Sequence, residues 1–385
     1  MDSLQLAEQG DADAQFALGI CCGNGEGVEK NLAQAAMWFR KAAELGHAKA
    51  QYALGVCHKN GLGVEQDYAQ TAMWWRMAAE QDHPKAQYYL GICYQFGLGV
   101  EQDLARAVMW FHRAAKLDHV SAQCDLGDCY KSGEGVQRDL TRAVMWYRKA
   151  AEQGDAAAQY NLGVCYRDGA GVAQDSTQAV TWDRKAAEQG HTEAQFNLGL
   201  GYYNGVGIER SLTGAVTWFR KSAEQGFAMA QFNLGLCYHN GVGVEKNLVE
   251  AVTWYRKAAE QGIAVAQYNL GLCYHNGEGV EKSLVEAVTW CRKAAEQGDA
   301  MAQFILGLCY YDGAGVEKDF VEAVAWYRKA AEQGYAEAQC NLGACYGKGE
   351  GVKQDSTQAV TWVHKSAEQG YEPAKEFMRI LGEIP

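Results

Sequence analysis

A 36-residue period runs along this chain and constrains its fold more than any other feature of the sequence. The dipeptide Leu-Gly recurs with this period from Gly19 to Gly343, and a tryptophan recurs with it from Trp38 to Trp362. A fixed period of about 20 to 50 residues is typical of repeat arrays, in which each unit packs on its neighbours. The period therefore predicts one array of about ten repeats, although 385 residues would by themselves suggest about two or three domains.

Each repeat contains two segments with helical periodicity. The first, helix A, places small and apolar residues at helical spacing and ends at the first glycine of a Gly-x-Gly motif. The second, helix B, follows an Asn, Asp or Ser at a fixed position, and all three are good N-cap residues. Helix B is expected to end at a glycine, which two repeats replace with Asp82 and Asp118. Because no segment alternates apolar and polar residues, we predict an all-α fold.

Two recurring residues are expected to hold each helix pair together. The glycine of Leu-Gly lies inside helix A, where glycine costs about 1 kcal/mol relative to alanine, so we expect helix B of the same repeat to approach it closely. The repeated tryptophans are expected to form the core between repeats. Trp75 falls outside their register and is expected to be exposed.

The expected organisation is one solenoid domain over residues 1–385. Residues 1–10 resemble the end of a repeat, residues 11–370 supply ten repeats, and residues 371–385 supply a C-terminal capping helix. Arg379 replaces the glycine that an eleventh repeat would carry, and the predicted cap runs from Glu372 to Leu381. The partial first repeat leaves open whether another segment precedes it.

Charge and composition exclude several classes of partner. The net charge of -12 disfavours a nucleic-acid partner. The sequence contains no run of about 18 apolar residues, so membrane insertion is not expected. The start has no features of a secretory signal, and thirteen cysteines without a glycosylation sequon fit a reducing compartment. We expect a cytoplasmic protein, with a secreted or translocated effector as the alternative.

Nine cysteines share one register, which places equivalent atoms about 8–10 Å apart in neighbouring repeats, whereas a disulfide needs Cα atoms within about 7 Å. We expect these residues to be buried free thiols. Four cysteines at other positions are the better candidates for reactivity, and they are Cys22, Cys124, Cys291 and Cys340. The register positions are Cys21, Cys57, Cys93, Cys129, Cys165, Cys237, Cys273, Cys309 and Cys345.

The sequence predicts no catalytic residue, no metal ligand and no cofactor. Cys237 and His239 are two residues apart on one helix and therefore face apart, which excludes a chelate between them. The Gly-x-Gly motifs follow helices and lack the third glycine of a nucleotide-binding loop. We find no nucleophile motif paired with a base.

Repeats such as AQFNLGLCYHNGVGVEKNLVEAVTWYRKAAEQG, at residues 230–262, resemble the Sel-1-like repeats, which are related to tetratricopeptide repeats. The resemblance covers nearly the whole chain. It implies a right-handed superhelical α-solenoid with helix A on the concave face, and a role as adaptor or scaffold without enzyme activity. Secreted cysteine-rich members carry a disulfide in each repeat, but Ala331 and Gln339 stand at two of those positions here.

An asparagine precedes Leu-Gly in five repeats, at a position inside helix A where asparagine is neutral to unfavourable. In superhelical tetratricopeptide proteins the matching asparagine grips the backbone of an extended peptide, so the resemblance implies ligand contact. The alternative is that these residues only set the packing of the helices. The five are Asn161, Asn197, Asn233, Asn269 and Asn341, with Asp125 in the same register.

Helical spacing around these asparagines adds further positions of the expected groove. Methionines among them suit an adaptable surface for a peptide or a helix. The added positions are Met229, Val265, Met301, Leu236, Leu272, Leu308, His239, His275, Tyr311, Asn240, Asn276 and Asp312.

The leading functional hypothesis is therefore a non-catalytic scaffold that binds a protein or peptide in this groove. A second hypothesis is a structural or self-assembling array, because two segments five repeats apart, residues 175–182 and 355–362, share the sequence DSTQAVTW. Hydrolase activity of the kind ascribed to cysteine-rich relatives ranks third, since no nucleophile and base pair together.

Overall fold

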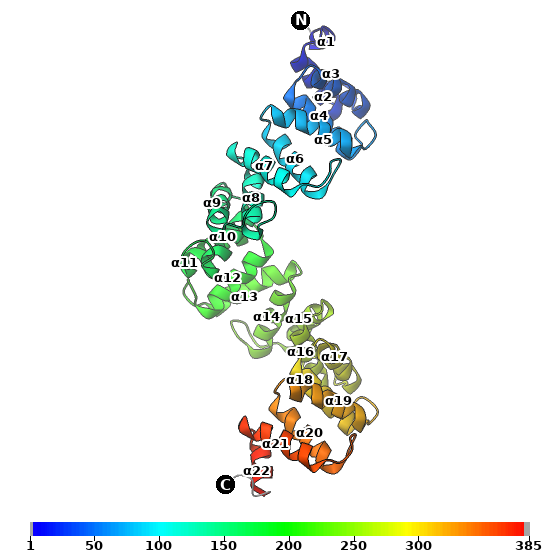
Figure 1. Ribbon diagram of the computed structural model, residues 1–385, viewed down its shortest axis with the longest axis vertical. Coiled ribbons are helices and arrows are strands. Elements are labelled where there is room, and N and C mark those ends of the chain that lie inside the picture. The colour runs from blue at the N-terminus through cyan, green and yellow to red at the C-terminus, as the bar shows by residue number, and fades with distance from the viewer. Residues whose placement is uncertain (1–2, 381–385) are drawn as a thin grey trace. The chain divides into compact units, whose positions relative to one another are not determined.

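The computed structural model describes residues 3–380, and within them it contains 22 helices and no strand (Figure 1). The predicted all-α repeat fold is confirmed. The even-numbered helices are the predicted helices A: α2 (Ala12–Asn24), α4 (Ala48–Asn60), α6 (Pro84–Phe96), α8 (Val120–Ser132), α10 (Ala156–Asp168), α12 (Thr192–Asn204), α14 (Ala228–Asn240), α16 (Ala264–Asn276), α18 (Ala300–Asp312) and α20 (Ala336–Lys348).

The odd-numbered helices from α3 onward are the predicted helices B: α3 (Leu32–Glu44), α5 (Tyr68–Glu80), α7 (Leu104–Lys116), α9 (Leu140–Glu152), α11 (Ser176–Glu188), α13 (Leu212–Glu224), α15 (Leu248–Glu260), α17 (Leu284–Glu296), α19 (Phe320–Glu332) and α21 (Ser356–Glu368). Two shorter helices flank the repeats, α1 (Ser3–Glu8) and α22 (Glu372–Ile380).

The helices begin and end at the capping residues that were predicted from the sequence. Asn247 caps α15 by accepting hydrogen bonds from the backbone N–H groups of Val249 and Glu250. Gly241 ends α14 in the left-handed conformation, with φ 69°, and donates its N–H to the carbonyl of Cys237. Asp82 and Asp118 replace the glycine after helix B and both adopt φ 58°, so the expected ends of these two helices are confirmed.

Helix B crosses helix A at the glycine of Leu-Gly. A Cβ atom added to Gly235 would lie 2.6 Å from the Tyr255 ring, and corresponding overlaps occur in the other repeats. The predicted close approach is therefore confirmed. The expectation for Trp75 was wrong: this side chain is only 3% exposed and covers Gly55 as Tyr255 covers Gly235. Helix B has two consecutive core positions, and Trp75 occupies the second one.

Buried glutamines join successive repeats. Gln267 of α16 donates to the Ala259 carbonyl of α15 at 3.0 Å and accepts from the Gln297 amide, which follows α17, at 2.8 Å. The same glutamine pair recurs between repeats at Gln81–Gln51, Gln153–Gln123, Gln189–Gln159, Gln225–Gln195, Gln261–Gln231, Gln333–Gln303 and Gln369–Gln339. This role of the glutamines was not predicted from the sequence.

The second glycine of Gly-x-Gly also connects repeats. Gly243 has φ 69°, and a Cβ atom there would overlap the carbonyl group of Leu212, the first residue of helix B in the preceding repeat. The motif therefore needs its first glycine to end helix A and its second to let the loop pack against the neighbouring repeat.

The chain divides into two compact units, one reaching Ala194 and the other beginning at Gln195. Within each unit, helices that follow one another in sequence pack together, as the adjoining ribbons of α2 to α7 and of α13 to α19 show (Figure 1). The core of the first unit contains Trp110, Trp146 and Trp182, in agreement with the predicted role of the tryptophans. A single domain over the whole chain stays a prediction.

The predicted C-terminal helix is present as α22. It buries Ala374 and Met378 against Val363 of α21, and its polar side carries the ion pairs Lys375–Glu372 and Arg379–Glu376. Leu381, the predicted last residue, lies outside the described residues. Among residues 3–380, no helix has the length and apolar character that a membrane span requires.

Candidate functional site

The predicted groove positions lie on one face of successive helices A, because they are spaced three, four and seven residues apart within each helix. Met229 and Met301 are 39% and 46% exposed. The remaining positions differ in burial. Leu236, Leu272, His239 and Tyr311 are partly buried, whereas Asn240, His275 and Asn276 are exposed.

The five asparagines are partly buried, and the structure gives several of them internal partners. The amide of Asn233 donates to the Met229 carbonyl at 2.8 Å, and the amide of Asn269 donates to the Val265 carbonyl at 2.7 Å. These bonds lie within the asparagine's own helix. They satisfy one amide hydrogen and hold the side chain in place at the surface.

The other asparagines sit in different surroundings. Asn161 donates to Asp128, which belongs to the helix A of the preceding repeat, at 3.4 Å. Asn341 and Tyr327 of α19 line the same hollow. Asn197 lies in α12 and is partly buried. Asn161 thus contributes to packing between helices, whereas Asn233 and Asn269 bond within their own helix, and all five asparagines remain partly accessible.

A hollow of about 220 Å³ brings four predicted groove positions together, on α18 and α20. The Tyr311 hydroxyl donates to Glu350 at 2.7 Å and accepts from the Lys348 ammonium group at 3.3 Å. The hydrogen bond to the Glu350 carboxylate raises the pKa of Tyr311. This tyrosine is therefore a fixed, neutral wall of the hollow. The groove positions at the hollow are Leu308, Tyr311, Asp312 and Asn341.

Asp125 replaces the asparagine in its repeat and lines another hollow, in the first unit. Burial raises the pKa of Asp125 to about 6, against the effect of a hydrogen bond from Tyr88. Asp128 lines the same hollow and accepts a hydrogen bond from the Tyr147 hydroxyl at 2.6 Å. Lys131 and Arg138 complete a lining in which both signs of charge occur.

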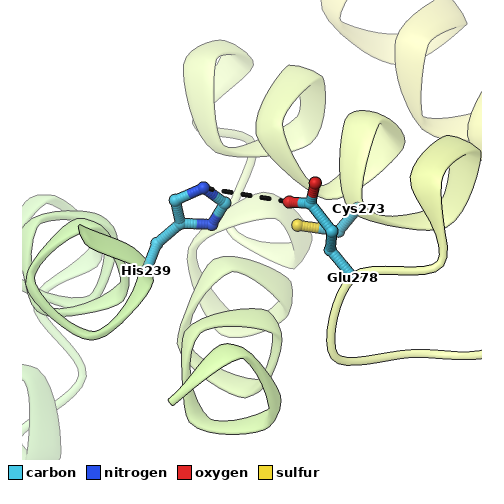
Figure 2. A group of neighbouring side chains, drawn as sticks. All are labelled: His239, Cys273 and Glu278. Atoms are coloured by element: carbon cyan, nitrogen blue, oxygen red, sulfur yellow. Dashed lines mark ion pairs between the residues drawn. The ribbon is translucent and has the colours of Figure 1, made fainter. Parts of the chain in front are cut away.

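His239, Cys273 and Glu278 converge from two repeats (Figure 2). His239 lies in the last turn of α14, Cys273 lies in α16, and Glu278 lies in the loop after α16. The histidine Nε2 atom is 3.9 Å from a Glu278 carboxylate oxygen. This group was not predicted from the sequence, because the candidate partner for His239 was Cys237 in the same helix. Aligning consecutive repeats would have revealed it.

All thirteen cysteines are free thiols. Burial raises the pKa of Cys57, Cys93 and Cys237 to about 11, so these register cysteines are protonated near neutral pH. The expectation of free thiols is confirmed, and the buried state holds for every register position except the partly buried Cys21.

The burial of the four other cysteines does not favour greater reactivity, which stays a prediction. Cys22, Cys124 and Cys291 are buried, and Cys340 is partly buried. Burial raises the pKa of all four thiols, that of Cys291 to about 12. Cys291 covers Gly271 at the core position where most other repeats have an aromatic ring. Their departure from the register reflects substitutions in the helix packing.

A chain of consecutive helix pairs, joined through buried glutamines and Gly-x-Gly turns, is an α-solenoid repeat protein. The model of the Sel1 repeat matches ten successive segments: residues 12–47, 48–83, 84–119, 120–155, 156–191, 192–227, 228–263, 264–299, 300–335 and 336–371. The chain belongs to the Sel1-repeat family, whose members are generally repeat scaffolds.

Two solved structures illustrate the similarity. One is a protective antigen of uropathogenic Escherichia coli that displays an SLR fold, with 39% identity, a TM-score of 0.77, and coverage of 99% of this chain and 89% of that one. The other is a Sel1 repeat protein from Oxalobacter formigenes, with 35% identity, a TM-score of 0.62, and coverage of 80% and 89%. No curated protein matches the chain.

Proposed function

We propose that this protein is a non-catalytic scaffold that binds an extended peptide along its helices A, in α14, α16 and α18. The observation that supports this most directly is the repetition of an accessible apolar residue with a neighbouring asparagine. Met229 accompanies Asn233, and Val265, which is 37% exposed, accompanies Asn269. A rigid helix presents each pair, and α18 presents the exposed Met301 with Ile305 in place of the asparagine.

The asparagines retain hydrogen-bonding capacity for a ligand. A carboxamide has two N–H hydrogens and a carbonyl oxygen, and the bond from Asn233 to the Met229 carbonyl uses only one hydrogen. An extended chain rises about 3.3 Å per residue, so asparagines on successive helices A would meet separate residues of one extended peptide. Such contacts would recognise the peptide backbone, and the apolar positions would select among peptide side chains.

The double variant Asn233→Ala with Asn269→Ala tests this proposal. Its matched control is Thr253→Ala with Thr289→Ala, on exposed faces of α15 and α17. These hydroxyls also donate to carbonyls four residues earlier, so both double variants remove the same kind of helical hydrogen bond.

Twelve-residue peptides selected by display on the unaltered protein are the probe, and isothermal titration measures their affinity. Loss of two hydrogen bonds of about 0.5–1.5 kcal/mol each predicts binding about 5- to 140-fold weaker in the asparagine variant. The threonine variant should bind like the unaltered protein, and both should keep similar melting temperatures. Equal affinity for all three proteins would refute the role of the asparagines.

Self-assembly is the second candidate, and a stripe on the helices B of the first unit favours it. Met37, Met73, Met109 and Met145 occupy one register and are 42%, 41%, 42% and 44% exposed. Flexible exposed methionines suit an apolar contact with another chain. Light scattering should then show a mass that grows with concentration and that Met109→Lys with Met145→Lys reduces to the monomer mass. A constant mass would exclude this candidate.

We also propose that the protein works in a reducing compartment such as the cytoplasm. Thirteen free cysteines support this location, since thiols persist where glutathione and thioredoxin keep them reduced.

A further inference from the structure

We propose that His239, Cys273 and Glu278 form a Zn²⁺ site that links two consecutive repeats. Their candidate ligand atoms, an imidazole nitrogen, the thiol sulfur and a carboxylate oxygen, all lie within 4.8 Å of one another (Figure 2). Tetrahedral zinc has bonds of about 2.0–2.3 Å, which separate its ligand atoms by roughly 3.5 Å. A small inward movement of the partly buried His239 and Glu278 side chains would close the site.

Two buried polar atoms at this group of side chains have no hydrogen-bond partner. The Nδ1 atom of His239 is buried and has no hydrogen-bond partner, and the same is true of the hydroxyl of Tyr255. The two rings are neighbours, with centroids 6.1 Å apart, and the Tyr255 side chain is fully buried. A buried polar atom without a partner costs about 1–3 kcal/mol, so two on adjacent side chains need a reason. A bound ion and its water would supply one.

The next repeats show what these three positions can do. In the register two repeats further on, Tyr311 replaces the histidine and donates its hydroxyl hydrogen to Glu350 at 2.7 Å. The loop carboxylate at this register therefore reaches the side chain on the preceding helix A. Asn276 also donates to the second oxygen of Glu278 at 3.2 Å, which orients the carboxylate toward His239. Partners of this kind commonly fix metal ligands.

The three donors favour zinc over harder cations. Mg²⁺ and Ca²⁺ prefer oxygen ligands alone, whereas a thiolate with an imidazole suits Zn²⁺. On binding, the Cys273 thiol releases its proton to the buffer as the S–Zn bond forms, and a water molecule retains the fourth position. Because Cys273 and His239 belong to different helices A, the ion would cross-link α14 to α16. Among the described residues, no second group of three such side chains comes this close.

The test uses the full chain, reduced and freed of metal, with ZnCl₂ as titrant. Calorimetry should give one high-affinity Zn²⁺ per chain, and CoCl₂ should produce the near-ultraviolet absorption of a thiolate–cobalt bond. Cys273→Ser and Glu278→Gln should each weaken binding at least about tenfold, and Cys273→Ser should abolish the cobalt band. The matched control is Cys309→Ser in the following repeat, where Ala314 replaces the glutamate, and it should bind normally.

A gain-of-site variant makes the test independent of any folding defect in Cys273→Ser. Ala314→Glu gives the following repeat the same three residues, His275, Cys309 and a glutamate, at equivalent positions. Its expected stoichiometry is two Zn²⁺ per chain. The proposal is overturned if the unaltered chain binds no zinc, or if it binds one ion that neither Cys273→Ser nor Glu278→Gln weakens.

Discussion

Asp183 is an acidic residue in the core, and its surroundings show how one substitution departs from the repeat. It covers Gly163, where the neighbouring repeats place Tyr147 and Phe219. It is 1% exposed and pairs with Arg167, yet one of its carboxylate oxygens has no hydrogen-bond partner. Burial raises the pKa of Asp183 to about 6, and Arg167 only partly opposes this effect.

Replacing this carboxylate with the aromatic ring of the repeat should stabilise the protein. The folded-state pKa of Asp183 exceeds its ordinary value of 3.8, so its stabilisation is fully present below about pH 4 and is lost as the pH rises through 6. We expect Asp183→Phe to raise the stability at pH 7.5 by about 2–3 kcal/mol.

Thermal unfolding of Asp183→Phe and the unaltered protein at pH 4.5 and pH 7.5 measures this difference. The gain in melting temperature should be larger at pH 7.5, where the buried Asp183 is ionised, than at pH 4.5, where it is protonated. Other titrating groups are common to both proteins and do not contribute to the difference. A gain of equal size at both pH values would show that the Asp183 carboxylate carries no penalty for burial.

At the scale of the helix, most features follow from local chemistry. The N-cap at Asn247 and the left-handed glycine at Gly241 depend on residues within one turn, so the sequence reveals where helices begin and end. The second core position of helix B was not predictable in the same way. Tyr255, Cys291 and Val363 all occupy it, and only their contact with a glycine in another helix defines their common role.

Two glycines in α20 allow the effect of helix propensity on stability to be measured separately from the effect of close packing. A Cβ atom at Gly343 would lie 2.9 Å from the Ala359 carbonyl oxygen, whereas at Gly347 the nearest atom would be 3.7 Å away. Alanine favours a helix by about 1 kcal/mol over glycine. We therefore expect Gly347→Ala to stabilise the protein by up to about 1 kcal/mol.

Gly343→Ala should instead destabilise the protein, by about 1–3 kcal/mol, because backbone of α21 must move away. Urea unfolding of both variants measures the two effects within one helix. Stabilisation by Gly343→Ala would show that helix B does not require the glycine.

At the scale of the whole chain, contacts between repeats carry information that a single repeat does not. The predicted asparagines were visible as a register, but their partners, such as Asp128 for Asn161, belong to another repeat. The group of His239, Cys273 and Glu278 was invisible within one helix for the same reason. The sequence thus predicted the repeat and its candidate face, while the pairing of unlike residues across repeats required the structure.

Because contacts are limited to neighbouring repeats, a destabilising substitution should affect only the repeats next to it. Gln267→Met removes the hydrogen bonds to the Ala259 carbonyl and the Gln297 amide, and leaves both groups without that partner. The Ala259 carbonyl keeps a hydrogen bond from the Gly262 N–H group, and the exposed Gln297 amide can bond to water, so each lost hydrogen bond costs about 0.5–1.5 kcal/mol. The stability of a repeat array is approximately a sum of repeat and nearest-neighbour terms. We therefore expect faster amide hydrogen exchange in α15 to α17 and unchanged exchange in α5 to α7.

Mass spectrometry of peptides from both regions measures this pattern, and Gln102→Met supplies the control. Gln102 also donates its amide to a backbone carbonyl, that of Gln95, but it is exposed, so water replaces the lost bond and exchange should stay unchanged throughout. If Gln267→Met instead accelerated exchange equally in every helix, the chain would unfold as one cooperative body. Exchange confined to the altered repeats would show that each junction between repeats contributes its own share of the stability.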